Sequence, residues 1–127
     1  MKTLSFLLLF FTISSCTIFK GQKMTKTELF FGLSKSNGEI ISNQDWQAFA
    51  DSVIAKTFSE GSTLIDARGQ WRNEDGKIIS EPSKVLILIS RISTARSKQI
   101  DLVREKYKKY FQQSSVLRVD GLVSAEF

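Results

Sequence analysis

The alternation of apolar and polar residues along the chain predicts four β-strands. Residues 25–34 (TKTELFFGLS) place Leu29, Phe31 and Leu33 on one face, which is the two-residue period of a half-buried strand. The other three stretches are residues 62–71, 77–90 and 114–120, and the final LVSAEF is a candidate for a fifth short strand. Pro82 within residues 77–90 predicts a bulge or an edge position, because proline has no N–H to donate to the ladder.

Two other stretches repeat apolar residues at the spacing of an α-helix. The first begins at an N-cap at Ser42 and continues to about Phe58, and the second spans residues 93–113, capped by Ser93 or Thr94. Their apolar stripes are Trp46, Phe49, Ala50, Val53 and Ile54 in the first helix, and Ile100, Val103, Tyr107, Tyr110 and Phe111 in the second. Asn37-Gly38 and Asp75-Gly76 are turn signals, and the second is typical of a β-hairpin.

The resulting order, β-α-β-β-α-β, predicts a ferredoxin-like α+β fold with the first and third strands central and both helices on one face of an antiparallel sheet. Residues 85–89 (VLILI) are apolar on both faces, and Phe30 points away from Leu29 and Phe31. One layer of helices leaves the second apolar face uncovered, as at an interface. Three interpretations remain open: a homodimer that pairs two sheets, coverage by the chain's own termini, or a small-ligand cleft in a monomer.

Within residues 62–71 and just after them, polar side chains occupy every second position: Asp66, Arg68, Gln70 and Arg72. If Ala67, Gly69 and Trp71 face the helices, this polar row lies on the uncovered face. It could be a solvated strand face with a modest ion pair between Asp66 and Arg68. It could instead be the rim of a pocket, completed by Glu81, Ser83 and Lys84 and binding a carboxylate or phosphate through Arg68 and Arg72.

The N-terminus predicts a lipoprotein signal peptide at residues 1–15. Lys2 precedes an apolar run of about ten residues, which suits a signal peptide and is too short to span a membrane. Ile13-Ser14-Ser15-Cys16 resembles a bacterial lipobox, in which the cysteine carries diacylglycerol and becomes the first residue. Residues 16–24 would then be the lipidated cysteine and a short linker, and 25–127 one α+β domain. The residue after Cys16 is Thr17 and not the aspartate that signals retention in the inner membrane. If the host is Gram-negative, we therefore expect the protein in the outer membrane of the cell envelope.

Composition removes several functional classes. The chain has one cysteine and no histidine, which argues against zinc or another metal, against a histidine-dependent triad and against a disulfide. No phosphate-binding glycine loop or nucleophile elbow is present, and no cofactor is expected. The net charge of +5 comes from scattered lysines and arginines, so we interpret it as solvated surface of an exported domain that meets no nucleic acid, with attraction to anionic lipid headgroups as the alternative.

Several segments in order resemble a bacterial family, domain of unknown function family 3574. They are TELFFGLS, DWQAF, DARGQWR, GKIISEPSKVLIL and YKKYFQQSSVLRVD, and together they cover about residues 25–120. The family's members are small and often secreted or lipid-anchored, and it has no established activity to transfer. The resemblance implies that DARGQW, EPSKV and SVLRVD are its signature segments, which adds Trp71 and Arg118 to the candidate ligand-binding residues.

Two hypotheses about function follow. The first is a non-catalytic, membrane-tethered binding or assembly module that recognises an anionic ligand or a protein partner. The second is a small cofactor-independent enzyme with Glu81 or Asp66 as general base and Arg68 or Arg118 stabilising an oxyanion. Burial discriminates between them, because a catalytic carboxylate needs an apolar cleft. The thin inventory of catalytic residues favours the binding module.

Overall fold

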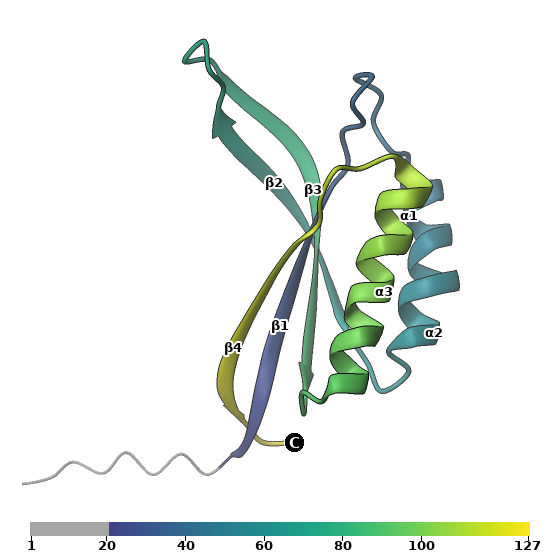
Figure 1. The fold of residues 1–127 in the computed structure, drawn as a ribbon, viewed down its shortest axis with the longest axis vertical. Helices are drawn as coiled ribbons and strands as arrows, with labels where there is room; N and C mark the ends of the chain where they lie inside the picture. Colours follow the sequence, from purple (N-terminus) through teal and green to yellow (C-terminus); the bar gives the residue numbers. More distant parts are fainter. Residues whose placement is uncertain (1–20) are drawn as a thin grey trace, which may run out of the picture.

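A computed structural model describes residues 21–127, which form one antiparallel sheet with a layer of helices on one side (Figure 1). The strands are β1 (Gln22–Gly32), β2 (Thr63–Arg72), β3 (Ile78–Ser90) and β4 (Leu117–Ala125). The helices are α1 (Asn43–Phe49), α2 (Ala55–Thr57) and α3 (Thr94–Phe111), and a π-helical segment (Ala50–Ile54) joins α1 to α2. The predicted signal peptide and Cys16 lie outside the described residues.

The strand order is β2-β3-β1-β4, and all three neighbouring pairs are antiparallel. The two helical stretches follow β1 and β3 and cover the same face of the sheet (Figure 1). This arrangement is the ferredoxin-like α+β fold, with the first and third strands central, so the predicted fold is confirmed.

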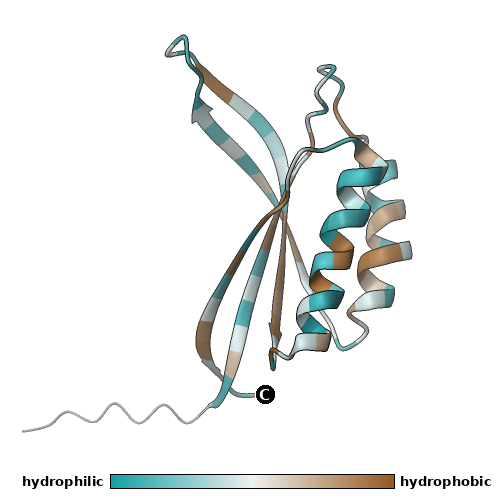
Figure 2. Cartoon of the chain, in the orientation of Figure 1, coloured by the Kyte–Doolittle hydropathy of each residue, from teal (hydrophilic) through white to brown (hydrophobic). Residues whose placement is uncertain are grey.

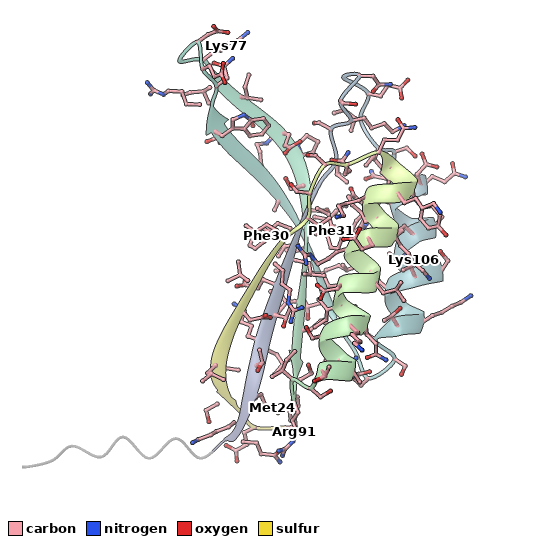
Figure 3. The ribbon with its side chains drawn as sticks, viewed as in Figure 1. Met24, Phe30, Phe31, Lys77, Arg91 and Lys106 are labelled. Atoms are coloured by element: carbon pink, nitrogen blue, oxygen red, sulfur yellow. The ribbon has the colours of Figure 1, made fainter. Side chains whose placement is uncertain are left out.

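The core lies between the sheet and the helices and is strongly aromatic. Phe31 of β1 contacts Tyr107 and Trp46 edge to face, with ring centroids 4.7 and 5.3 Å apart. Figure 3 shows why the alternation matters: Phe31 points toward the helices, whereas Phe30 points to the opposite side of the same strand. Phe31 is accordingly fully buried and Phe30 is 37% exposed.

Both predicted helix starts are confirmed by their caps. The Ser42 hydroxyl accepts a hydrogen bond from the Asp45 N–H at 3.0 Å, and the Ser93 hydroxyl accepts one from the Arg96 N–H at 3.1 Å. The helix after Ser42 runs to Thr57 as expected, although its middle has π-helical hydrogen bonding. In α3 the predicted stripe holds except at Tyr110, which is 62% exposed because it lies at the edge of the contact with α1.

Two boundary predictions are wrong. Strand β1 begins at Gln22, so residues 22–24 belong to the sheet and not to a linker. The C-terminal segment is no separate fifth strand, because residues 121–125 continue β4 and pair with the start of β1. The start of β1 and the end of β4 pair with each other, so the ladder continues beyond the residues in which apolar and polar positions alternate.

Pro82 is not in a bulge or an edge strand, as the sequence had suggested. It lies in β3, a central strand, and its register with β2 is continuous from Thr63↔Ile87 to Arg72↔Ile78. Gly32↔Ser83 is the last register pair of β1 and β3, and beyond it the Leu33 N–H still donates to the Pro82 carbonyl at 3.0 Å. The next carbonyl of β1, that of Leu33, accepts instead from the Ile41 N–H at 2.8 Å, so no donor is required from Pro82.

Candidate ligand cleft and open sheet face

The face of the sheet opposite the helices, called here the open face, is largely apolar and also carries Lys26 and Glu28 on β1. None of the helices or strands formed by residues 21–127 lies over it (Figure 1). Figure 2 shows hydrophobic residues along β3 and β4, interspersed with hydrophilic ones. Trp71, Leu117 and Val119 on this face are 48, 59 and 42% exposed. Its apolar members include Met24, Phe30, Ile65, Ala67, Trp71, Ile79, Val85, Ile87, Ile89, Leu117, Val119 and Val123.

The polar row on β2 lies on the helix side of the sheet, not on the open face. Asp66 is directly opposite Lys84 and forms an ion pair with it, and the Lys84 ammonium nitrogen lies 5.9 Å from the centroid of the Trp46 ring in α1. Residues 68, 70 and 72 share the face of Asp66 by the two-residue period. The expectation that Ala67, Gly69 and Trp71 face the helices is therefore wrong.

The reversal has a simple geometric cause. The hairpin of β2 and β3 extends well past the helix layer, and Lys77 at its tip is far from α1 and α3 (Figure 3). The helix side of that extension is in water, so it carries polar residues. The Arg68 guanidinium, for example, donates to the Ser80 hydroxyl at 3.4 Å. Asp66 pairs with Lys84 and not with Arg68.

A cleft of about 550 Å³ lies at one end of the open face. Its floor and walls include three of the predicted ligand-binding residues: Trp71, Glu81 and Ser83. Asp66, Arg68, Gln70, Arg72, Lys84 and Arg118 do not line it. Its remaining walls come from two loops far apart in the sequence, residues 34–36 after β1 and residues 112–115 after α3.

Two glycines shape the floor of the cleft around Glu81. Gly69 is directly opposite Glu81 on β2, and Gly32 lies diagonal to it on β1. A Cβ on Gly32 would lie 3.0 Å from the Glu81 Oε1 atom, so the carboxylate rests over the bare backbone of that glycine. Glycine inside a strand is a sequence signal of such a close approach, and it could have pointed to this cleft.

The loop walls are held by hydrogen bonds. The Gln113 side-chain amide donates to the Ser34 carbonyl at 3.0 Å, which ties the two loops together. Lys35 forms an ion pair with Glu39 at 3.2 Å, and the pKa of Glu39 is lowered by its hydrogen bonds with Asn37 and then Lys35. The charge of Lys35 is therefore balanced within its own loop.

Tyr107 supports the cleft from the helix side of the sheet. Its hydroxyl donates to the carbonyl of Gly32 at 2.7 Å, at a point where β4 no longer pairs with β1. Burial raises the pKa of Tyr107 well above its ordinary value, and the negative charge of Glu81 raises it further. The tyrosine thus stays neutral, and its hydroxyl keeps its hydrogen bond to the Gly32 carbonyl.

Arg118 is committed to contacts within the fold. Its guanidinium donates to Ser97 at 2.9 Å and to Asp120 at 2.9 Å, and its Nη1 atom lies 3.3 Å from the Asp101 carboxylate. The hydrogen bond from Arg104 is the main cause that lowers the pKa of Asp101, and the charge of Arg118 contributes to the lowering. Arg118 therefore joins β4 to α3.

Two further observations bound the chemistry of the described part. Between residues 21 and 127, no group of three or more histidine, cysteine, aspartate or glutamate side chains is placed to hold a metal ion. In the same range, no helix is long and apolar enough to cross a membrane.

Fold and cleft together define a small ferredoxin-like α+β protein with an uncovered sheet face. The chain belongs to the family described as Protein of unknown function (DUF3574), whose sequence profile matches residues 26–127. This match confirms the resemblance found in the sequence, and the family has no established activity. No curated protein sequence is significantly similar to this chain.

Solved structures with a similar fold share little sequence with this chain. A phage SAM lyase in complex with S-methyl-5'-thioadenosine has a TM-score of 0.56 at 16% identity, over 82% of this chain and 92% of the lyase. The periplasmic divalent cation tolerance protein CutA from Archaeoglobus fulgidus has a TM-score of 0.49 at 12% identity, over 84% of this chain and 88% of CutA. CutA1 from Oryza sativa has a TM-score of 0.48 at 11% identity, over 82% of this chain and 84% of CutA1. At such identities the similarity concerns the fold alone.

Proposed function

We propose that the protein is a lipid-anchored, non-catalytic assembly module of the bacterial cell envelope, and that a second copy of the chain docks on its open face. The observation that carries this proposal is the apolar face itself. Isolated exposed apolar residues are ordinary, but a contiguous apolar face rimmed by polar residues marks an interaction site. A homodimer buries the face on both chains at once.

The size of the face suits a second copy. Four strands spaced by about 4.8 Å and about nine residues long at about 3.3 Å each give about 600 Å² in flat projection. Because side chains project from the sheet, the accessible area of the face is larger than this flat projection. It is close to the ~800 Å² that each partner buries in a standard stable interface.

The charge of the face also suits a second copy. Lys26 and Glu28 share the open face and form an ion pair at 2.9 Å, so the centre of the face is close to neutral although the chain is basic. Two such faces can therefore meet without the like-charge repulsion that suppresses wrong partners.

The lipid anchor remains a proposal that rests on the lipobox. Only five residues lie between Cys16 and the start of β1 at Gln22, and the six Cα–Cα steps from Cys16 to Gln22 span at most about 21 Å when extended. An anchored domain would therefore hold this end of the sheet close to the membrane, and Met24 and Arg91 lie at this end (Figure 3). Basic side chains there, Lys23 and Arg91, would favour anionic headgroups. The outer membrane is the expected location if the host is Gram-negative.

The enzyme hypothesis loses most of its residues in this geometry. The side chain of Asp66 is 85% exposed and paired with Lys84, and Arg118 is held by α3. Of the four proposed catalytic residues, only Glu81 lines the cleft, and no arginine stands beside it there. Arg68 and Arg72 remain candidates for binding an anion, on the helix side of the hairpin and apart from the cleft.

Native mass spectrometry of the purified protein, released from mild non-ionic detergent, tests the second copy. The wild type is expected as a dimer. Ile87→Lys places a charge at the centre of the open face, and Glu28 directly opposite gives the new ammonium group a partner in the folded monomer. This variant is expected to be monomeric.

Leu102→Lys is the matched control, because Leu102 is 52% exposed on α3, away from the open face, and should leave the dimer intact. A wild-type monomer at micromolar concentration, or a dimer that persists in Ile87→Lys, would refute docking of a second copy on this face.

A further inference from the structure

We infer that the cleft beside Glu81 binds a small organic cation, with an ammonium group on the Glu81 carboxylate and an apolar portion against Trp71. The inference does not rest on pairing of two copies, because a single chain supplies every wall of the cleft. It rests on the balance of charge, on the shape of the floor and on the aromatic walls.

The charge of the cleft is negative. Among the described residues that line it, Lys35 and Glu81 alone are charged, and Lys35 is paired with Glu39. Glu81 is partly buried and has no ion pair within residues 21–127. A bound ammonium group would give this carboxylate a partner through a charge-assisted hydrogen bond.

The floor leaves room for such a group. Gly32 and Gly69 flank Glu81 on the two neighbouring strands and contribute no side chain to the open face. Ser83, the next open-face residue of β3, adds a hydroxyl that can accept a second hydrogen bond from an ammonium group. The volume of about 550 Å³ lies in the range of small-molecule sites.

The walls add an aromatic surface on either side of the carboxylate. Trp71 on β2 pairs with Ile79 and is therefore the diagonal neighbour of Glu81, at about 7 Å between their backbones. Phe30 and Leu117 line the other side, from β1 and β4. Trp71 is 48% exposed, so its ring can contact the apolar portion of the bound cation.

Three probes of nearly equal shape test the charge preference by isothermal titration of the purified protein: phenethylammonium, 2-phenylethanol and 3-phenylpropionate. Phenethylammonium is expected to bind at least tenfold more tightly than the alcohol, and the propionate most weakly. Equal binding of all three, tighter binding of the propionate, or no binding of the ammonium probe would overturn the inference.

Two variants locate the site. Glu81→Gln is expected to weaken phenethylammonium binding by about ten- to a hundredfold and to leave the alcohol unchanged. Glu74→Gln makes the same change of charge in the hairpin turn, outside the cleft, and should change nothing. Unchanged binding in Glu81→Gln would overturn the inference.

Gly69→Val provides an independent check should Glu81→Gln fold poorly. Its Cβ would meet Ser83 and Glu81 at ordinary contact distances of 3.4 and 3.7 Å, and β-branched residues suit strands. The added bulk on the floor is expected to abolish binding of the ammonium probe, and retained binding would contradict the site. Native mass spectra of the same samples distinguish the homodimer proposal from the cation-binding inference. A monomer that binds the cation would refute the homodimer and leave the cation site standing.

Discussion

Replacing Tyr107 with phenylalanine removes one hydroxyl from the centre of the protein. Tyr107 is fully buried, and its hydroxyl donates to the Gly32 carbonyl at 2.7 Å. Strand β4 pairs with β1 only as far as Phe30, so it offers that carbonyl no replacement donor. The ring itself stays in the aromatic core, because phenylalanine keeps the contacts with Phe31 and Trp46.

The expected loss is the cost of a buried carbonyl without a donor. That cost is about 1–3 kcal/mol, and the absence of any change in ring packing favours the lower half of this range. For a domain of this size, about 1.5 kcal/mol corresponds to a fall in Tm of roughly 6–10 °C. We expect the free energy of unfolding at pH 7 to fall by that amount.

Alkaline pH gives a second readout of the same residue. The raised pKa of Tyr107 means that its contribution to stability is complete below the ordinary tyrosine pKa of about 10 and is lost as pH rises toward the folded-state pKa. Between these two pKa values the wild type loses about 1.4 kcal/mol of stability per pH unit through Tyr107, and Tyr107→Phe does not. The difference in stability between the wild type and Tyr107→Phe should therefore narrow above pH 10.

Urea denaturation followed by circular dichroism measures both effects. Tyr110→Phe is the matched control, since Tyr110 is 62% exposed and its loss of a hydroxyl should change stability by less than about 0.5 kcal/mol. Equal stability of Tyr107→Phe and the wild type at pH 7 would show that the hydrogen bond to Gly32 contributes nothing. A stability gap that stays constant from pH 7 to pH 11 would refute the assigned cause of the pKa shift.

Two further predictions concern residues that the sequence marked as candidate sites. Arg118→Ala should lower the free energy of unfolding by about 2 kcal/mol, because Ser97, Asp101 and Asp120 lose their shared partner. Arg72→Ala is the control and should leave stability nearly unchanged. Similar urea midpoints for the two variants would contradict a structural role of Arg118. Cys16→Ser should yield an unprocessed precursor that takes up no labelled palmitate, and a wild type that also takes up none would contradict the lipobox assignment.

Local patterns were enough to predict the elements and their order. The caps at Ser42 and Ser93, the turns at Gly38 and Gly76 and the buried stripe of Leu29, Phe31 and Leu33 all follow from interactions within a few residues of the chain. With the order β-α-β-β-α-β, few topologies remain, and the ferredoxin-like one was found. The family followed from short segments read in order.

Part of the candidate site was also within reach of the sequence. Trp71, Glu81 and Ser83 were all candidate ligand-binding residues and line one cleft, although Trp71 was expected on the helix side. Their association follows from the hairpin, because strands joined by a tight turn bring a few nearby residues into register. The loops at 34–36 and 112–115 could not be added, since nothing local indicates that the ends of β1 and α3 meet.

Which face of β2 meets the helices was decided by tertiary structure alone. The two-residue period divides the strand into Asp66, Arg68 and their neighbours on one side and Ala67, Gly69 and Trp71 on the other, but it assigns neither side to the core. The length of the hairpin beyond the helix layer made that choice, and so placed Trp71 in the cleft. Arg118 likewise has its partners on α3, about 20 residues away in sequence, and only packing could reveal them. Sequence periodicity thus determined which residues share a face, and packing of distant elements determined what each face meets.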